Sequence, residues 1–121
     1  RGYAFERFCR KHARKIAEVL GFSGIRYEFG SWFRSARGRA AQIDLLFFRA
    51  DHVATVCEVK YTGRLDGKLV ESLERKIGIL GCYFDGGIQK VLILGRNASV
   101  PSSVQASFDV VLEAEDVFFD D

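Results

Sequence analysis

Two acids and a lysine lie in two strand-like stretches of this sequence. Asp44 belongs to residues 42–49, and Glu58 and Lys60 belong to residues 53–61. Side chains alternate along a strand, so Glu58 and Lys60 share one face, roughly 6.6 to 6.8 Å apart. Because acids and lysines are rarely buried without partners, these residues indicate a polar site.

The link between the two stretches predicts that Asp44 lies beside Glu58. Residues 49–52 form a short polar turn, which favours an antiparallel hairpin. Positions 44 and 58 are symmetric around position 51 in that turn. Two carboxylates on adjacent strands suit Mg²⁺ or Mn²⁺, which takes a few oxygen ligands and keeps its remaining waters.

Hydrolysis of a phosphodiester needs these groups. A carboxylate-bound metal activates water and screens the phosphoryl oxygens. The ammonium of Lys60 could orient that water and stabilise the developing oxyanion, and lysine suits this role because its pKa moves readily with its surroundings. Three simpler interpretations stay open: an ion pair between Glu58 and Lys60, a strand-edge charge at Asp44, and a helix-dipole role for Glu6.

Arginines form two clusters that could contact phosphates. The spacing of apolar residues predicts one helix over residues 3–20, whose other face carries five cations and could equally be a solvated face. The second cluster lies in a predicted loop, residues 34–41, where Trp32 and Phe33 nearby could stack on bases or join the core. The arginines proposed for nucleic-acid binding are Arg10, Arg14, Arg34, Arg37 and Arg39.

The remaining pattern predicts a single α/β domain over residues 1–121. A strand over residues 25–33 precedes the hairpin, and an amphipathic helix over residues 69–84 follows it. The apolar run at residues 91–94 predicts a central strand reached by a helical crossover. A helix over residues 101–107, a strand over residues 110–112 and a helix over residues 114–119 complete an α-β-β-β-α-β order with a short tail.

The composition sets limits on the class of protein. The chain has 121 residues, a net charge of +2, three cysteines and no methionine. No apolar run reaches the roughly 18 residues of a membrane span, and the cysteines and histidines lack the spacing of a zinc module. We therefore expect buried, reduced thiols in a cytoplasmic protein, and the start at Arg1 without methionine suggests excision from a longer chain.

The acids and the lysine resemble a known signature. Ile43-Asp44, followed after thirteen residues by Glu58-Val59-Lys60, is similar to the PD-(D/E)xK nuclease superfamily, whose fold is that of restriction endonucleases. An isoleucine stands where that family often has proline. The resemblance implies a restriction-endonuclease-like αβββαβ core with a mixed central sheet flanked by helices.

The resemblance also implies roles for individual residues. Asp44 and Glu58 would bind Mg²⁺ or Mn²⁺, the backbone carbonyl of Val59 would complete the metal shell, and Lys60 would position the attacking water. Glu6 matches the helix glutamate that many members carry as an accessory ligand. The expected function is metal-dependent DNA cleavage, with a homodimer as one possible assembly.

Residues 1–6 and 42–46 resemble nuclease-like domains at the C-terminal end of bacterial and archaeal AAA-type ATPases. This resemblance implies an ATPase domain earlier in the same chain. It also leaves an alternative function open, a catalytically silent domain that binds nucleic acid or docks onto that ATPase.

Overall fold

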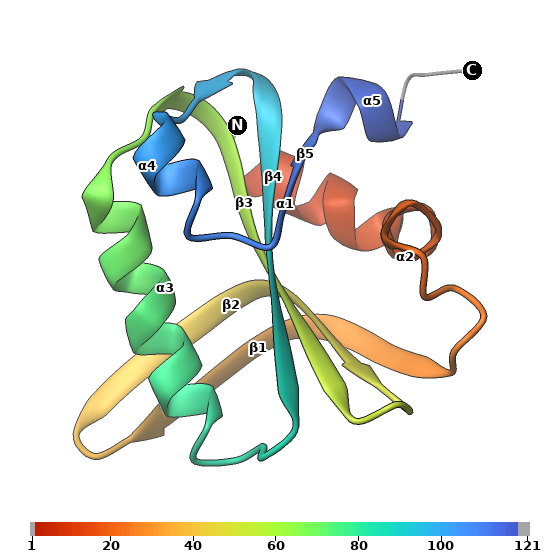
Figure 1. Cartoon of the computed structure of the whole chain (residues 1–121), viewed down its shortest axis with the longest axis vertical. Coiled ribbons are helices and arrows are strands. Elements are labelled where there is room, and N and C mark those ends of the chain that lie inside the picture. The colour runs from red at the N-terminus through yellow and green to blue at the C-terminus, as the bar shows by residue number, and fades with distance from the viewer. Residues whose placement is uncertain (1, 119–121) are drawn as a thin grey trace.

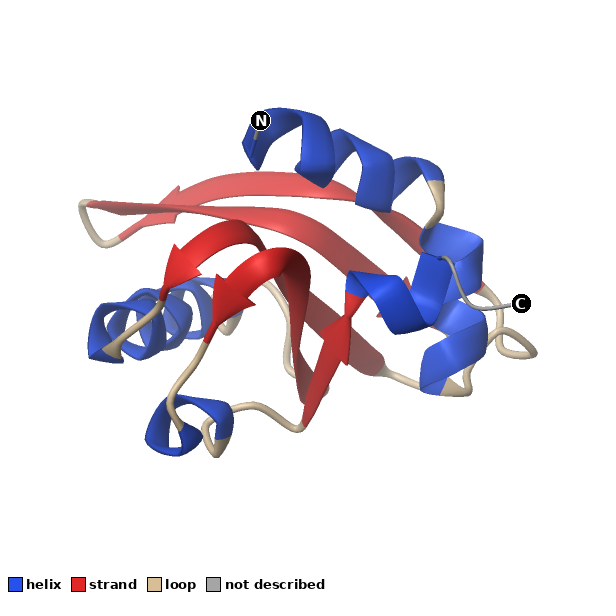
Figure 2. Ribbon diagram, turned by 90° about the horizontal axis from the view of Figure 1, so that it is seen from above, coloured by secondary structure: helices blue, strands red, loops and turns tan. Residues whose placement is uncertain are grey.

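The computed structural model describes residues 2–118 and shows a five-stranded mixed sheet flanked by helices (Figures 1 and 2). Phe119, placed in the last helix by the sequence pattern, and Arg1 lie outside the described residues. The strands are β1 (Tyr27–Ala36), β2 (Arg39–Arg49), β3 (Val53–Arg64), β4 (Gly87–Ser99) and β5 (Val110–Glu113). The helices are α1 (Gly2–Lys11), α2 (Ala13–Leu20), α3 (Gly67–Leu80), α4 (Ser102–Gln105) and α5 (Ala114–Phe118).

The sheet order is β1-β2-β3-β4-β5. The first three strands are antiparallel, and β4 and β5 run parallel to β3. The predicted hairpin is confirmed, because Leu45 lies opposite Cys57, the register that the symmetry around position 51 requires. The predicted crossover is also confirmed: α3 links β3 to β4, and Val91 to Leu94 are buried between two layers of helices.

Each face of the sheet carries its own core. On one face Leu73 and Leu80 of α3 pack with Val56 and Leu92, and α4 adds Val104. On the other face α1, α2 and α5 cover Leu45, Cys57 and Ile93. Figure 1 shows these two helix layers on either side of the sheet.

The single helix predicted over residues 3–20 is wrong at one position. His12 separates α1 from α2, with φ −109° and ψ 30°. The apolar spacing did not reveal the break because hydrogen bonding continues across it: His12 N donates to Phe8 O and Ile16 N donates to His12 O.

The predicted loop over residues 34–41 is also mostly wrong. β1 and β2 extend through it, and only Arg37 and Gly38 form the turn, with φ 58° and 76°. Two successive residues with positive φ match the twist of paired strands, so a two-residue turn suffices here.

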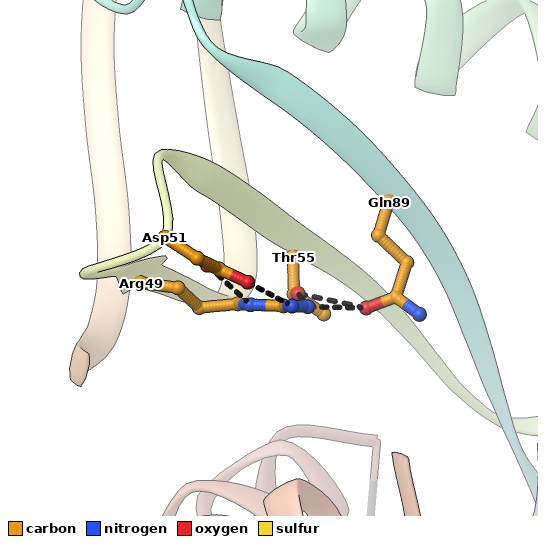
Figure 3. A network of polar contacts seen from close by, with 4 residues as sticks. All are labelled: Arg49, Asp51, Thr55 and Gln89. Carbon is orange, nitrogen blue, oxygen red and sulfur yellow. Dashed lines mark hydrogen bonds and ion pairs between the residues drawn. The ribbon is translucent and has the colours of Figure 1, made fainter. Parts of the chain in front are cut away.

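A polar network fixes the turn end of the β2–β3 hairpin (Figure 3). Arg49 binds both carboxylate oxygens of Asp51, at 3.0 and 2.6 Å, and also donates to Thr55 and Gln89. Because these residues come from β2, the turn, β3 and β4, the network ties three strands together.

The opposite end of that hairpin opens. β2 and β3 pair only from Leu45 to Phe48 and from Ala54 to Cys57. Before Leu45 the recorded partners of β2 lie on β1, and beyond Cys57 those of β3 lie on β4. We call the point of separation, at Asp44 and Glu58, the fork; β2 and β3 diverge from it in Figure 1.

Candidate metal and phosphate site

Asp44 lies at the fork because β2 carries an extra residue there. Gly30 pairs with Leu46 but Trp32 pairs with Ile43, so two steps on β1 match three on β2. Such a bulge bends a strand and frees it from its neighbour. The buried Asp44 carboxylate then takes the place of a backbone carbonyl of β2 as hydrogen-bond acceptor. Its Oδ2 accepts a hydrogen bond from the Val59 N–H at 3.2 Å.

Glu58 is fully buried on the α3 side of β3. Its carboxylate accepts from the ammonium of Lys76, with Nζ 3.1 Å from Oε1 and 2.9 Å from Oε2. Burial raises the pKa of Glu58, and the positive charge of Lys76 opposes that rise. The interpretation of Glu58 and Lys60 as an ion pair is therefore wrong, since Glu58 pairs with Lys76.

Lys60 is half-buried and makes no hydrogen bond or ion pair within residues 2–118. It lines a pocket of about 250 Å³ together with Arg64 and Lys68. Asp66 lies at the same pocket, but its carboxylate already accepts the Lys68 N–H as the N-cap of α3. The chain thus presents three cations beside the fork, on the face covered by α3.

Glu6 approaches the fork from α1, on the other face. Its pKa is raised by partial burial and next by the negative charge of Asp44, while Arg10 and Lys60 oppose the rise. Burial raises the pKa of Cys9 to about 12, and the negative charges of Asp44 and Glu6 add to this rise. Glu6 and Asp44 are therefore close enough to repel, as two acids around a cation site would be.

The oxygen donors at the fork fit a divalent cation in part. Oδ1 of Asp44 accepts no hydrogen bond within residues 2–118. Because the N–H and C=O of one residue in a strand point toward the same edge, and the Val59 N–H points to Asp44, the Val59 carbonyl lies on the side of Asp44. Both oxygens of Glu58 are engaged by Lys76, and no three acidic, histidine or cysteine side chains among the described residues converge tightly enough to form a metal site.

A cation could therefore take Asp44 and the Val59 carbonyl directly, with Glu6 as a further oxygen donor. Glu58 would become a ligand only after Lys76 released it. Mg²⁺ keeps several waters and is usually bound by few protein oxygens, so a donor set of this size is of the kind it takes.

Lys76 is the site residue that the sequence analysis missed. It is buried on α3 between Leu73 and Leu80. The spacing of Leu69, Leu73, Lys76 and Leu80 is 4, 3 and 4, which is the spacing of one buried helix face. A lysine within that apolar stripe was the signal for a buried acid on the facing strand.

The predicted phosphate-contacting arginines are dispersed. Arg34, Arg37 and Arg39 are exposed at the far end of the β1–β2 hairpin, and Arg14 is exposed on α2. Arg10 is half-buried and its guanidinium lies 3.4 Å from the backbone oxygen of Asp44, so it belongs to the fork itself. The aromatic residues beside the hairpin arginines differ: Trp32 is core, whereas 60% of Phe33 is exposed.

The cysteines fit the expected class only in part. Cys9 and Cys57 are buried, but Cys82 is exposed, which contradicts the expectation that all three are buried. Cys82 lies after the end of α3 at Leu80, outside the buried face of that helix, and the count and spacing of the cysteines do not indicate this.

No known protein family, curated protein or solved structure matches this chain. Within residues 2–118 no helix is long and apolar enough to cross a membrane.

Proposed function

We propose that this domain hydrolyses phosphodiester bonds of nucleic acid with the help of Mg²⁺ or Mn²⁺, and that DNA is its preferred substrate. The supporting observation is the fork itself. It combines an Asp44 carboxylate with a free oxygen, a Lys60 ammonium without a hydrogen-bond or ion-pair partner in the described chain, and a neighbouring pocket lined by two further cations.

Each side chain has a distinct part in the proposed reaction. Asp44 and the Val59 carbonyl would hold the cation, with Glu58 or Glu6 completing its oxygen shell. The bound metal would supply a more acidic water and neutralise phosphoryl charge. Lys60 would hold the attacking water by a hydrogen bond, and Arg64 and Lys68 would bind the phosphates beside the scissile bond.

A second candidate function is favoured by one observation, the contact between Lys76 and Glu58. A buried lysine that neutralises a proposed metal ligand would suit a domain that binds nucleic acid without cutting it, or that docks onto an ATPase partner domain. In that case Lys76 would stabilise the fold and Asp44 would only satisfy the Val59 N–H.

Cleavage assays distinguish the two functions. The domain is incubated with supercoiled plasmid, single-stranded DNA and RNA, with Mg²⁺, with Mn²⁺ and with chelator. Metal-dependent nicking is expected, with plasmid and single-stranded DNA cut in preference to RNA. Retention of nucleic acid by the protein in chelator, without any cleavage in metal, would support the silent domain instead.

Two substitutions test the assigned residues. Asp44→Asn keeps the shape and an oxygen acceptor, and Lys60→Met keeps much of the aliphatic stem. Each should lower cleavage by at least about 100-fold, the usual effect of removing one group that stabilises the charge developing in a transition state. Glu74→Gln, an exposed acid on α3, is the matched control and should retain full activity. Undiminished cleavage by Asp44→Asn or by Lys60→Met would contradict the assignment.

A further inference from the structure

A pocket of about 500 Å³ lies beside the fork, on the face covered by α1, and the proposed reaction does not use it. Three aromatic side chains line it, Phe5, Phe8 and Tyr61. The rings of Phe5 and Tyr61 are tilted by 54° with centroids 5.4 Å apart, and 37% of Tyr61 is exposed. The pocket therefore offers aromatic surface to a ligand, in a volume typical of small-molecule sites.

The floor of this pocket depends on Gly95. A Cβ added at position 95 would lie 2.4 Å from the backbone oxygen of Tyr61, so β4 can pass this close to β3 only with glycine there. A register shift between β3 and β4 falls at the same point, opposite Tyr61. The cavity is thus built into the sheet by a local irregularity of β4.

Polar groups from β4 and α5 complete the wall. Asn97 offers both an amide donor and an acceptor, and Arg96 and Glu115 form an exposed pair at 2.8 Å. Aromatic faces combined with such hydrogen-bonding groups match the faces and edges of a nucleobase. An aliphatic ligand would use neither the aromatic faces nor the Asn97 amide.

The position of the pocket links it to the fork. Tyr61 follows Lys60 on β3, and Phe5 precedes Glu6 on α1. Alternation on the strand sends Lys60 toward the α3 face, where it lines the cationic pocket, and Tyr61 toward the α1 face. Beyond the fork the side of β3 that faced β2 has no strand partner among residues 2–118, so a nucleic-acid strand could pass between the two pockets there.

We propose that this aromatic pocket binds a single unstacked nucleobase of the substrate strand while the neighbouring phosphate lies at the fork. This proposal rests on the nucleic-acid substrate of the proposed function and narrows it to nucleic acid with an unpaired nucleotide. A base inside a duplex cannot reach such a pocket unless it leaves the stack.

The test compares two single-stranded oligonucleotides with the same backbone, one with bases and one without. One is a short run of thymidines carrying a fluorophore, and the other has abasic nucleotides in the same backbone, so both have equal numbers of phosphates. Binding to the 121-residue chain is followed by fluorescence anisotropy in chelator, which prevents cleavage. Loss of bases should weaken binding about 5- to 150-fold, the range measured for one stacked base.

Variants then locate the base. Two variants remove the aromatic face: Tyr61→Ala, and Tyr61→Leu, which keeps apolar bulk. In each, the ratio of the affinities for the two oligonucleotides should shrink, so that its logarithm is about one half of the original value or less. Phe33→Ala removes an exposed aromatic residue from the β1–β2 hairpin and should retain the full difference in affinity between the two oligonucleotides. A full difference in both Tyr61 variants, or its loss in Phe33→Ala, would overturn the pocket assignment.

The outcomes separate this inference from the proposed function. Binding that needs bases and Tyr61, without cleavage in Mg²⁺ or Mn²⁺, would support the pocket and contradict the hydrolysis. Cleavage with no dependence on bases would do the reverse. Failure to bind either oligonucleotide would contradict the pocket directly.

Discussion

Lys76 on α3 binds both carboxylate oxygens of Glu58 on β3, at 3.1 and 2.9 Å, and both side chains are almost fully buried. A buried acid that already has a cation can accept a metal only by exchanging one positive charge for another. Under the proposed function, the pair would therefore connect the stability of the domain to the binding of a cation at the fork.

Removal of the Lys76 charge is expected to destabilise the domain and to increase the effect of metal. Lys76→Met leaves Glu58 buried without its partner, which should lower the free energy of unfolding by about 3–5 kcal/mol. Because Glu58 is then free, Mg²⁺ should stabilise this variant more than the original chain. Urea unfolding with Mg²⁺ and with chelator measures both effects.

The matched control is Lys68→Met, which removes an exposed lysine from the same helix. The double substitution Lys76→Met with Glu58→Leu should recover most of the lost stability, because no buried charge remains. If Mg²⁺ stabilised Lys76→Met no more than the original chain, Glu58 would not be a metal ligand.

The pH dependence of stability should reflect the two acids with raised pKa values, Glu6 and Glu58. Each acid holds its proton more tightly in the folded chain than in the unfolded chain. Between the ordinary pKa and the raised pKa, the folded state therefore binds more protons. The free energy of unfolding should then fall as the pH rises from the ordinary glutamate value of 4.5 through the raised values. Urea unfolding at several pH values measures this slope.

Glu6→Gln isolates one of these contributions. The slope should become shallower in Glu6→Gln and stay unchanged in Glu74→Gln, whose carboxyl is exposed on α3. Saturating Mg²⁺ should also reduce the slope, because a cation favours the ionised acids. An identical slope in Glu6→Gln and the original chain would show that folding, through burial and the charge of Asp44, does not raise the pKa of Glu6.

The β1–β2 hairpin, whose turn end carries Arg37 and Arg39, should contribute to nucleic-acid affinity through charge alone. Arg37→Asn with Arg39→Gln removes two exposed cations, and asparagine tolerates the positive φ of position 37. If both arginines contact phosphates, the slope of log affinity against log salt should become shallower by about 1.4 to 1.8, on the usual 0.7–0.9 per contact. Anisotropy titrations at several salt concentrations measure that slope.

Arg26→Gln removes an exposed arginine just before β1 and serves as the charge control. Its salt slope should match that of the original chain. Equal slopes for the double variant and Arg26→Gln would show that the hairpin does not contact phosphates.

Thiol reactivity should distinguish the three cysteines. Burial raises the pKa of Cys9 to about 12 and that of Cys57 well above its ordinary value, whereas Cys82 is exposed. A thiolate is the reactive form, so a disulfide reagent at pH 8 should modify one thiol per folded chain and three after unfolding. Cys82→Ser should abolish the native reaction, and rapid modification of a second thiol in that variant would contradict the burial of Cys9 and Cys57.

The sequence alone is sufficient to predict that Asp44 and Glu58 lie near each other on neighbouring strands. A short turn with equal strand lengths on both sides leaves few possible registers, and the observed pairing of Leu45 with Cys57 is the expected one. The bulge at Asp44 was not predictable, because Ile43, Leu45, Leu46 and Phe47 are all apolar and show no change of alternation where the face reverses.

The tertiary partner of Glu58 was harder to predict. Strand alternation shows that Lys60 shares a face with Glu58 but not which other charge reaches that face. The rotation of α3 about its own axis decides that Lys76 faces the sheet, and the apolar stripe indicates this rotation only when the lysine is counted as part of it. Long-range pairing between a helix and a strand is set by packing, which local spacing does not encode.

The fork also has a consequence for the order of folding. The turn between β2 and β3 spans only residues 50–52, and hairpins form in about 1–10 μs. Lys76 arrives with the crossover from β3 to β4, a non-local contact whose loop closure is slower. We expect Asp44 and Glu58 to come together before α3 places Lys76 against Glu58. A cation present during folding could therefore bind the two acids before Lys76 does. Kinetic φ-values that are higher in the β2–β3 hairpin than at Leu73 would support this order.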